Sequence, residues 1–296
     1  MAPKEPQVIM CADGYYRLEP MPSAHELSAF YESSYYDLIR QGGRAPELRR
    51  YLEKGKAGDD ELNWRACTLY DSVAEALKSA QCRSVLEIGC GVGSLVSHLV
   101  NAGFDAQGVE PAKDAANAAT RLGVRVFEGD YKAFRSNDVS RVDAIVLLNV
   151  LEHVPDPVGM LKDVRDGLNE AGIVIIRVPN DFSEIQAAAS ARLNGKRWWI
   201  ASPDHINYFN FETLSSVLNE VGFDVTCSMG DFPMELFLLM GRDYTSDPEL
   251  GEKCHKERMS FELSMLPEQL RSIYRALATV GIGRNCFVVA RRANSK

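Results

Sequence analysis

Hydrophobic residues between positions 84 and 178 fall in five short runs that alternate with amphipathic stretches. The runs predict β-strands at 84–88, 105–109, 125–127, 144–148 and 173–178. A helix is predicted between the last two strands, because Asp156 can cap it, Pro157 suits its first position and apolar residues follow at helical spacing. Strands that alternate with helices in this way form a parallel, doubly wound sheet.

The residues before position 84 show a different pattern of hydrophobic and polar positions. Residues 1–22 contain several prolines and little periodicity, which indicates an arm or an extended lead-in. Ser23 and Glu26 form a capping-box pair at the start of a predicted helix over 23–40. A second helix is predicted over about 59–79, with a buried face formed by Leu62, Ala66, Leu69, Val73 and Leu77.

The chain after this region also alternates. An irregular, aromatic-rich stretch over 180–211 is followed by a predicted helix around 214–221 and a predicted strand at 223–228. Residues 230–284 are predicted to be mostly helical, and 285–291 to form a last strand. The helices of 230–284 therefore interrupt the sheet near its end.

Together these elements predict an α/β protein with a doubly wound, mostly parallel, seven-stranded sheet. We expect an N-terminal helical cap or lid at 1–83 and the sheet-forming core at 84–229. A helical insert at 230–284, acting as a substrate cap or a dimer arm, would precede the final strand of the core at 285–296.

Amino-acid composition and net charge argue against several classes of protein. The 296 residues are 46% hydrophobic and 25% charged, as in an ordinary soluble globular protein, and the net charge is −8. No apolar run approaches the ~18 residues that span a bilayer, and the acidic balance argues against nucleic-acid binding. Seven cysteines without a C-x-x-C pair indicate free thiols in a reducing compartment, so a cytoplasmic location is expected.

The first strand of the core runs into a turn that carries alternate glycines at Gly89, Gly91 and Gly93. Glycines let a ligand approach the backbone closely, with the amides of the following helix facing it. Glu110 ends the next strand, where a carboxylate can accept both hydroxyls of a ribose. Glu87, two residues before the first glycine, would repel a pyrophosphate but attract a cationic amino-acid group. The G-x-G-x-G spacing also differs from the G-x-G-x-x-G of dinucleotide folds.

These motifs resemble those of class I S-adenosylmethionine (SAM)-dependent methyltransferases. The matching runs, in order, are V-L-E-I-G-C-G-V-G, the acid Glu110, the pair Gly129–Asp130, and D-A-I-V-L-L-N-V-L-E-H-V-P-D-P from Asp143. The last run is similar to that of ubiquinone-pathway O-methyltransferases and their small-molecule relatives. The resemblance implies a Rossmann-like core with SAM as cofactor and S-adenosylhomocysteine (SAH) as product.

The resemblance also implies which residues bind the cofactor. The methionine end would be held by Glu87, Gly89, Cys90, Gly91 and Gly93. Glu110 would bind the ribose, and Asp130 with Tyr131 the adenine. The sulfonium side would be lined by Asn149, Val150 and Leu151.

His153 and His205 are the predicted catalytic residues. Both follow core strands, at the sheet edge where open α/β folds bind ligands, so they can converge as a base and its partner. The structural alternative is that His153 caps a turn and His205 anchors its loop. Glu152, His153 and His205 also resemble part of a magnesium site with an E-x-x-E-H run, whose first Glu is here Asn149. Losing that carboxylate weakens a site for a hard cation, so no metal is predicted and Mg²⁺ is the minority alternative.

Aromatic residues suggest walls for a substrate, and the candidates are Tyr35, Tyr36, Trp199 and Tyr208. We expect a methyltransferase that acts on an oxygen or nitrogen of a small molecule, without nucleic-acid or membrane partners. The apolar insert is also compatible with a homodimer. Three alternatives stay open: an RNA or protein methyltransferase, an NAD-type Rossmann oxidoreductase, and a SAM-binding protein without transfer chemistry.

Overall fold

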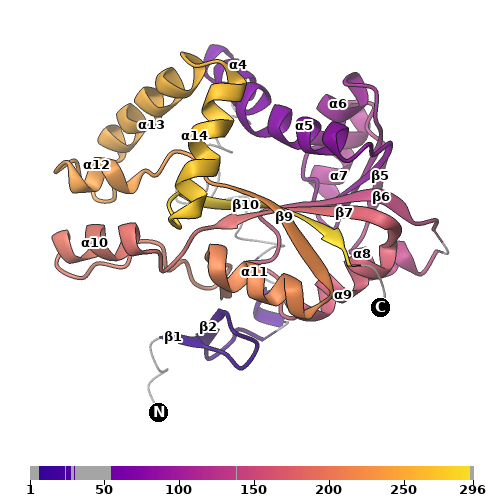
Figure 1. Ribbon diagram of the computed structural model, residues 1–296, viewed down its shortest axis with the longest axis horizontal. Helices are drawn as coiled ribbons and strands as arrows, with labels where there is room; N and C mark the ends of the chain where they lie inside the picture. Colours follow the sequence, from indigo (N-terminus) through magenta and orange to yellow (C-terminus); the bar gives the residue numbers. More distant parts are fainter. Residues whose placement is uncertain (1–6, 24, 28–29, 31–54, 138, 294–296) are drawn as a thin grey trace. The chain divides into compact units, whose positions relative to one another are not determined.

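The structure is a computed structural model that describes residues 7–23, 25–27, 30, 55–137 and 139–293 (Figure 1). The chain divides into two compact units. We call Pro22–Val139 the glycine-loop unit, and Met1–Met21 together with Ser140–Lys296 the histidine unit. The predicted N-terminal cap, 1–83, is therefore shared between the two units.

Seven strands form one sheet in the order β5-β4-β3-β6-β7-β10-β9. Their bounds are β3 (Ser84–Ile88), β4 (Asp105–Glu110), β5 (Val126–Glu128), β6 (Val142–Leu148), β7 (Leu168–Pro179), β9 (Phe223–Met229) and β10 (Asn285–Arg292). β10 runs antiparallel to both of its neighbours, β7 and β9, whereas the pairs β3–β4, β4–β5 and β6–β7 are parallel. The predicted seven-stranded, mostly parallel α/β sheet is confirmed.

The glycine-loop unit contains the parallel strands β5, β4 and β3. From residue 55 onward its described helices are α4 (Lys56–Arg65), a π-helical segment η1 (Ala66–Tyr70), α5 (Asp71–Ser79), α6 (Ser94–Asn101), α7 (Lys113–Arg121) and α8 (Tyr131–Arg135). α6 and α7 both pack on β4, so they fix the two turns that leave β3 and β4.

The helix predicted over 59–79 exists but is not one regular α-helix. The π-helical segment η1 adds one residue to a turn of the helix. The side chains before η1 therefore face a different direction from the one that a continuous helix with 3.6 residues per turn would give them. Val73 and Leu77, after the π-helical segment, are fully buried as predicted. Before it the predicted face is wrong: Leu62 is 39% exposed, whereas Glu61 and Trp64 are buried.

The start of the first predicted helix is also confirmed. The Glu26 carboxylate accepts hydrogen bonds from the Ser23 backbone N–H at 2.8 Å and from its hydroxyl at 2.7 Å, which is half of a capping box. The Ser23 hydroxyl accepts the Glu26 N–H at 3.2 Å in return. The rest of this prediction, over 31–40, lies outside the described residues.

The histidine unit contains strands β6, β7, β10 and β9. Its helices are α9 (Pro157–Gly167), α10 (Glu184–Arg192), α11 (Phe211–Glu220), α12 (Glu235–Leu239), α13 (Pro248–Leu263) and α14 (Pro267–Thr279). Figure 1 shows α14 beside one end of β10, with α12 and α13 farther from the sheet. Asp156 caps α9 as predicted, since its carboxylate accepts the Gly159 N–H at 2.8 Å.

The insert buries its apolar residues against itself. Met234, Phe237 and Cys254 form a core cluster, against which Phe232, Tyr244 and Leu250 pack. Internal packing therefore accounts for much of the apolar character that the sequence shows around 232–240, although Met240 remains 64% exposed. No described helix is both long and apolar enough to cross a bilayer.

A second, small sheet lies in the histidine unit. β1 (Gln7–Met10) and β2 (Tyr16–Glu19) form an antiparallel hairpin, and β2 pairs with β8 (Asn207–Tyr208). Tyr15 packs the hairpin against the chain after β8: it is 2% exposed and stacks on Phe209 at 5.1 Å between ring centroids. The segment interpreted as an arm therefore covers the loop that contains His205.

Candidate functional site

The glycine loop adopts a backbone that only glycine tolerates well. Gly89, Gly91 and Gly93 have φ angles of 71°, 55° and 80°, in the left-handed region. A Cβ on Gly93 would also press on Ala119 at 3.0 Å, so Gly93 lets α6 and α7 approach each other. A Cβ on Gly91 would meet no atom within 4 Å, so this glycine faces open space that a ligand can enter.

Glu87 is the most informative polar residue of this unit. It lies on β3, is 5% exposed, and its Oε2 atom is buried without a hydrogen-bond partner. Burial, together with the nearby Glu110 carboxylate, raises the pKa of Glu87 well above its usual range. A buried carboxylate oxygen without a hydrogen-bond partner costs free energy, which an ammonium group at this position would offset.

Glu110 shapes the loop with both carboxylate oxygens. One accepts the Gly91 N–H and the other the Ala112 N–H, each at 2.8 Å. Burial raises the pKa of Glu110, and these two hydrogen bonds counteract part of the increase. Each carboxylate oxygen keeps a second lone pair, so Glu110 can still accept two ribose hydroxyls.

The remaining predicted cofactor residues of this unit differ in exposure. Asp130 is exposed and caps α8, with its Oδ1 accepting the Ala133 N–H at 2.7 Å. Tyr131 is 5% exposed and packs on Phe134, so its side chain belongs to the core. The Cys90 thiol is buried and occupies the space where Gly108 has no side chain, which makes Cys90 a packing residue whose backbone belongs to the loop.

The two predicted catalytic histidines converge within the histidine unit. Their rings meet edge to face, with centroids 4.8 Å apart. His153 Nδ1 lies 2.9 Å from the Asp204 carbonyl oxygen, to which it donates its proton. This bond selects the tautomer in which Nε2 carries the lone pair, so His153 can accept a proton at Nε2.

Glu152 completes this cluster. One ligand atom from each of Glu152, His153 and His205 lies within 4.8 Å of the others, so the three residues are a candidate metal group. Glu152 is 1% exposed, and its Oε2 atom is buried without a hydrogen-bond partner. Burial raises its pKa, against the influence of His153. One carboxylate and two imidazoles are a poor donor set for Mg²⁺, which prefers oxygen ligands.

Asn149, Val150 and Leu151, predicted at the sulfonium side, lie in this unit between β6 and Glu152. Asn149 has a left-handed φ of 58°, and its side-chain Nδ2 donates to Glu152 Oε1 at 2.9 Å. The Leu151 side chain is fully buried, and its carbonyl accepts the Asn207 Nδ2–H at 2.9 Å. Asn207 thereby ties the turn before His153 to the loop of His205.

The predicted aromatic residues have different roles. Tyr208 is fully buried and donates its hydroxyl proton to the His205 carbonyl at 2.9 Å, so it supports the loop from inside. Trp199 is half-buried and meets Phe182 edge to face at 5.7 Å between centroids. Tyr35 and Tyr36 lie outside the described residues.

Sequence reasoning missed two aromatic residues of this group. Tyr16, on the hairpin, stacks on Phe182 at 4.4 Å between centroids, and Phe182 has a left-handed φ of 57°. Strained backbone at a non-glycine residue clusters at functional sites. The position of Phe182, directly after β7, is the one sequence feature that could have indicated it.

Comparisons with known proteins agree with this geometry. A family model described as a methyltransferase domain matches residues 48–228, which is more than half of the chain. The chain is 33% identical over 115 residues to the ubiquinone biosynthesis O-methyltransferase of Azorhizobium caulinodans, covering 36% of this chain and 44% of that protein. The enzyme of the same name from Alkalilimnicola ehrlichii is 31% identical over 118 residues, with 37% and 47% covered. The chain thus spans less than half the length of these relatives.

Solved structures show the same fold at low identity. Magnesium protoporphyrin IX methyltransferase from Synechocystis PCC 6803, with bound SAH, has a TM-score of 0.52 at 14% identity, covering 87% of this chain and 97% of that one. The plantazolicin methyltransferase BpumL, also with SAH, has a TM-score of 0.51 at 14% identity, with 90% and 94% covered. With the family match and the glycine-loop geometry, the conclusion is that this chain belongs to the class I SAM-dependent methyltransferase domain family.

Proposed function

We propose that this chain transfers a methyl group from SAM to an oxygen or nitrogen of a small-molecule acceptor. The observation that carries the proposal is the buried Glu87 carboxylate, whose Oε2 lacks a partner beside a glycine loop that opens at Gly91. Its charge and place suit the ammonium of an amino-acid moiety and disfavour a pyrophosphate. The names of the relatives, which concern small molecules, support the acceptor class.

The glycine-loop unit would hold the cofactor. Glu87 binds the ammonium, the backbone of the loop from Gly89 to Gly93 receives the methionine portion, and Glu110 accepts the ribose hydroxyls. Asp130 accepts a hydrogen bond from the adenine amino group with the carboxylate oxygen that does not cap α8. Bound SAM supplies a methyl group on a sulfonium, which leaves by in-line displacement.

The histidine unit would act on the acceptor. His153 Nε2 carries a lone pair because Nδ1–H is engaged by the Asp204 carbonyl, so this atom can take the proton that a hydroxyl loses during methylation. His205 lies against the His153 ring and orients it. The partly exposed rings of Trp199 and Phe182 offer an apolar wall that excludes water.

Calorimetric titration with SAH and with NAD tests the cofactor. We expect SAH to bind and NAD not to bind, and the reverse result would assign the chain to the oxidoreductases. Incubation with methyl-labelled SAM and a panel of phenols and amines, followed by mass spectrometry, tests the transfer. SAH binding without any labelled product from small molecules, RNA or protein would indicate a binding protein without transfer chemistry.

A variant pair tests the histidines. His205→Gln and His153→Gln should retain SAH binding and lose most turnover of a hydroxyl acceptor, by about 100-fold or more for loss of a general base. His98→Gln is the control, because His98 is on α6 and pairs with Asp71 at 3.2 Å. Full turnover in both site variants would contradict a catalytic role.

We also propose a cytoplasmic location. All seven cysteines are free thiols, which suits a reducing compartment. Labelling with a thiol reagent after denaturation of protein purified without reductant should modify all seven cysteines, and protection of any pair would argue against this location.

A further inference from the structure

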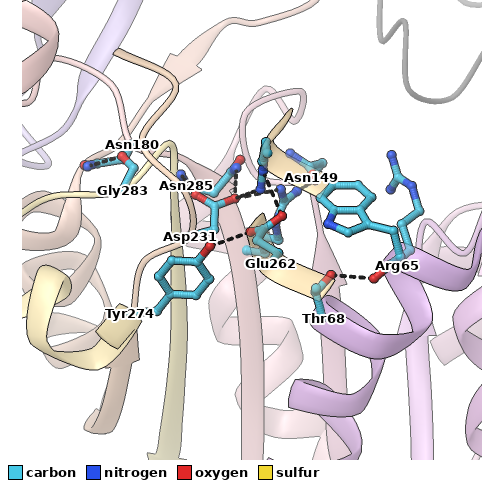
Figure 2. Close-up of polar contacts among 12 residues, drawn as sticks. Arg65, Thr68, Asn149, Asn180, Asp231, Glu262, Tyr274, Gly283 and Asn285 are labelled. Carbon is cyan, nitrogen blue, oxygen red and sulfur yellow. Dashed lines mark hydrogen bonds and ion pairs between the residues drawn. The ribbon is translucent and has the colours of Figure 1, made fainter. Parts of the chain in front are cut away.

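A buried ionic network connects the helical insert to the candidate catalytic cluster. Its distal end lies on α13 and α14, where Arg258 Nε donates to Glu262 Oε2 at 3.1 Å and the Tyr274 hydroxyl donates to Glu262 Oε1 at 2.5 Å. Arg258 Nη2 also donates to Asp231 Oδ2 at 3.1 Å. Figure 2 shows the Asp231, Glu262 and Tyr274 side chains of this network. Arg258, Glu262 and Tyr274 are each at most 7% exposed.

Asp231 joins this network to the sheet. It accepts the Asn285 backbone N–H at 2.9 Å and the Asn285 side-chain N–H at 2.6 Å, both from the start of β10. It also pairs with Arg177 Nη2, from β7, at 3.4 Å. Burial acts to raise the pKa of Asp231, but Arg258 and Arg177 outweigh it and hold the pKa below its usual range. Asp231 is therefore a fixed anion that orients the Arg177 guanidinium.

Arg177 in turn orients the catalytic cluster. Its Nη1 donates to Asn149 Oδ1 in a short hydrogen bond. Because one end of an amide accepts and the other end donates, this bond turns Asn149 Nδ2 toward Glu152. Asn149 Nδ2 then donates to Glu152 Oε1 at 2.9 Å, which leaves Glu152 Oε2 buried and without a partner.

We propose that Arg177 is a positioning residue that replaces a divalent cation at the cluster of Glu152, His153 and His205. Through Asn149 it fixes the Glu152 carboxylate, whose free Oε2 is then available to a hydroxyl or amine of the acceptor. The proposal rests on the proposed function only in assigning this cluster to the acceptor side.

Charge within the cluster supports the exclusion of metal. Glu152 is the one acid among the three candidate ligands. Arg177, linked to Glu152 through Asn149 and paired with Asp231, already places a positive charge beside this carboxylate. A divalent ion would add two more positive charges next to the partly buried guanidinium, with Glu152 as the one anionic ligand among the three candidates. A carboxylate at position 149 and a neutral residue at 177 would supply a second anionic ligand and remove the competing cation.

Manganese binding tests the proposal without an acceptor. Electron paramagnetic resonance of free Mn²⁺, which stands in for Mg²⁺, gives the fraction bound. Wild-type protein and the control Arg165→Met should bind Mn²⁺ equally weakly, since Arg165 donates to the distant Val221 carbonyl. The double variant Asn149→Glu/Arg177→Met should bind Mn²⁺ at least about tenfold more tightly, because it gains a carboxylate ligand and loses the competing cation. Double-variant binding no tighter than wild type would overturn the proposal.

If the double variant does not fold, single variants test the same proposal. Asn149→Glu alone keeps Arg177, which can pair with the new carboxylate, so it should fold and bind Mn²⁺ no better than wild type. Tight Mn²⁺ binding by this variant would overturn the proposal. Tight binding by wild type that is lost in Glu152→Gln would overturn it as well.

SAH titration of the same wild-type sample separates the two hypotheses. Normal SAH binding with tight wild-type Mn²⁺ binding refutes the role of Arg177 and leaves the methyltransferase proposal intact. Absent SAH binding refutes the proposed function, whatever the manganese result.

Discussion

At the scale of single residues, Glu87 carries the cofactor prediction. Glu87→Gln removes the charge that would face the ammonium and keeps the size of the side chain. Charge-assisted hydrogen bonds contribute about 1.5–3 kcal/mol, so SAH affinity should fall roughly 10–100-fold. Glu128→Gln, an exposed acid on β5 of the same unit, is the matched control for calorimetry. Equal affinities in the two variants would contradict the assignment of Glu87.

A second residue predicts a pH dependence. Burial raises the pKa of Asp181 from 3.8 to about 7. A carboxyl group whose folded pKa exceeds its unfolded value contributes stability at low pH, and this contribution is lost as the pH rises from about 4 to 7. Asp181→Asn keeps the acceptor for Gln186 and should raise the free energy of unfolding at pH 8 by a few kcal/mol, at about 1.4 kcal/mol per pKa unit.

Calorimetric unfolding at pH 4 and pH 8 checks this prediction. At pH 4 the variant and wild type should have similar stability, because Asp181 is then largely protonated in the folded protein. Asp224→Asn, at an exposed position on β9, is the control and should show no such difference. A stabilising effect of Asp181→Asn that is the same at both pH values would refute the mechanism.

At the scale of elements, the hairpin of β1 and β2 supports the loop that contains His205. Tyr15→Ala removes a buried ring stacked on Phe209 and should cost roughly 3–5 kcal/mol. In a protein of this size the melting temperature should fall by about 10 °C. Tyr16→Ala removes a partly exposed ring and is expected to cost much less, and comparable losses would show that the hairpin is not held through Tyr15.

The elements differ in how well sequence alone predicts them. Buried parallel strands such as β3 and β6 are short apolar runs, so their pattern is strong and their bounds were close. The hairpin was missed because its short strands are stabilised by contacts far along the chain, namely the pairing with β8 and the stacking of Tyr15 on Phe209. The predicted buried face of α4 was wrong because a π-helical segment shifts the helical repeat. No residue pattern in the sequence indicates this segment.

The candidate site shows the same division. The positions of Glu87, Glu110 and the two histidines at the carboxyl edge of the sheet could be predicted, because that edge is where α/β folds bind ligands. Arg177 was not, since an arginine within an apolar strand gives no hint of its contacts. Its partner Asp231, whose carboxylate pairs with the Arg177 guanidinium, lies more than fifty positions farther along the chain.

At the scale of the whole molecule, the net charge distinguishes the proposed small-molecule methyltransferase from the RNA methyltransferase alternative. With a net charge of −8, the chain should not gain affinity from counterion release on a phosphate backbone. Gel-shift titration with single-stranded RNA at low salt should therefore show no complex at micromolar protein, with or without SAH. A salt-sensitive complex would favour the RNA methyltransferase alternative, and a neutral polysaccharide of similar length serves as control.

The position of β10 has a consequence for how the protein is made. Both neighbours of β10, β7 and β9, precede it in the chain, yet β7 keeps one edge unpaired and β9 has no partner in the described sheet until residues 285–292 arrive between them. During synthesis the histidine unit therefore exposes unpaired strand edges while the insert is translated. Such edges pair readily with other chains, so this interval is when the nascent protein is most prone to aggregate and most in need of a chaperone.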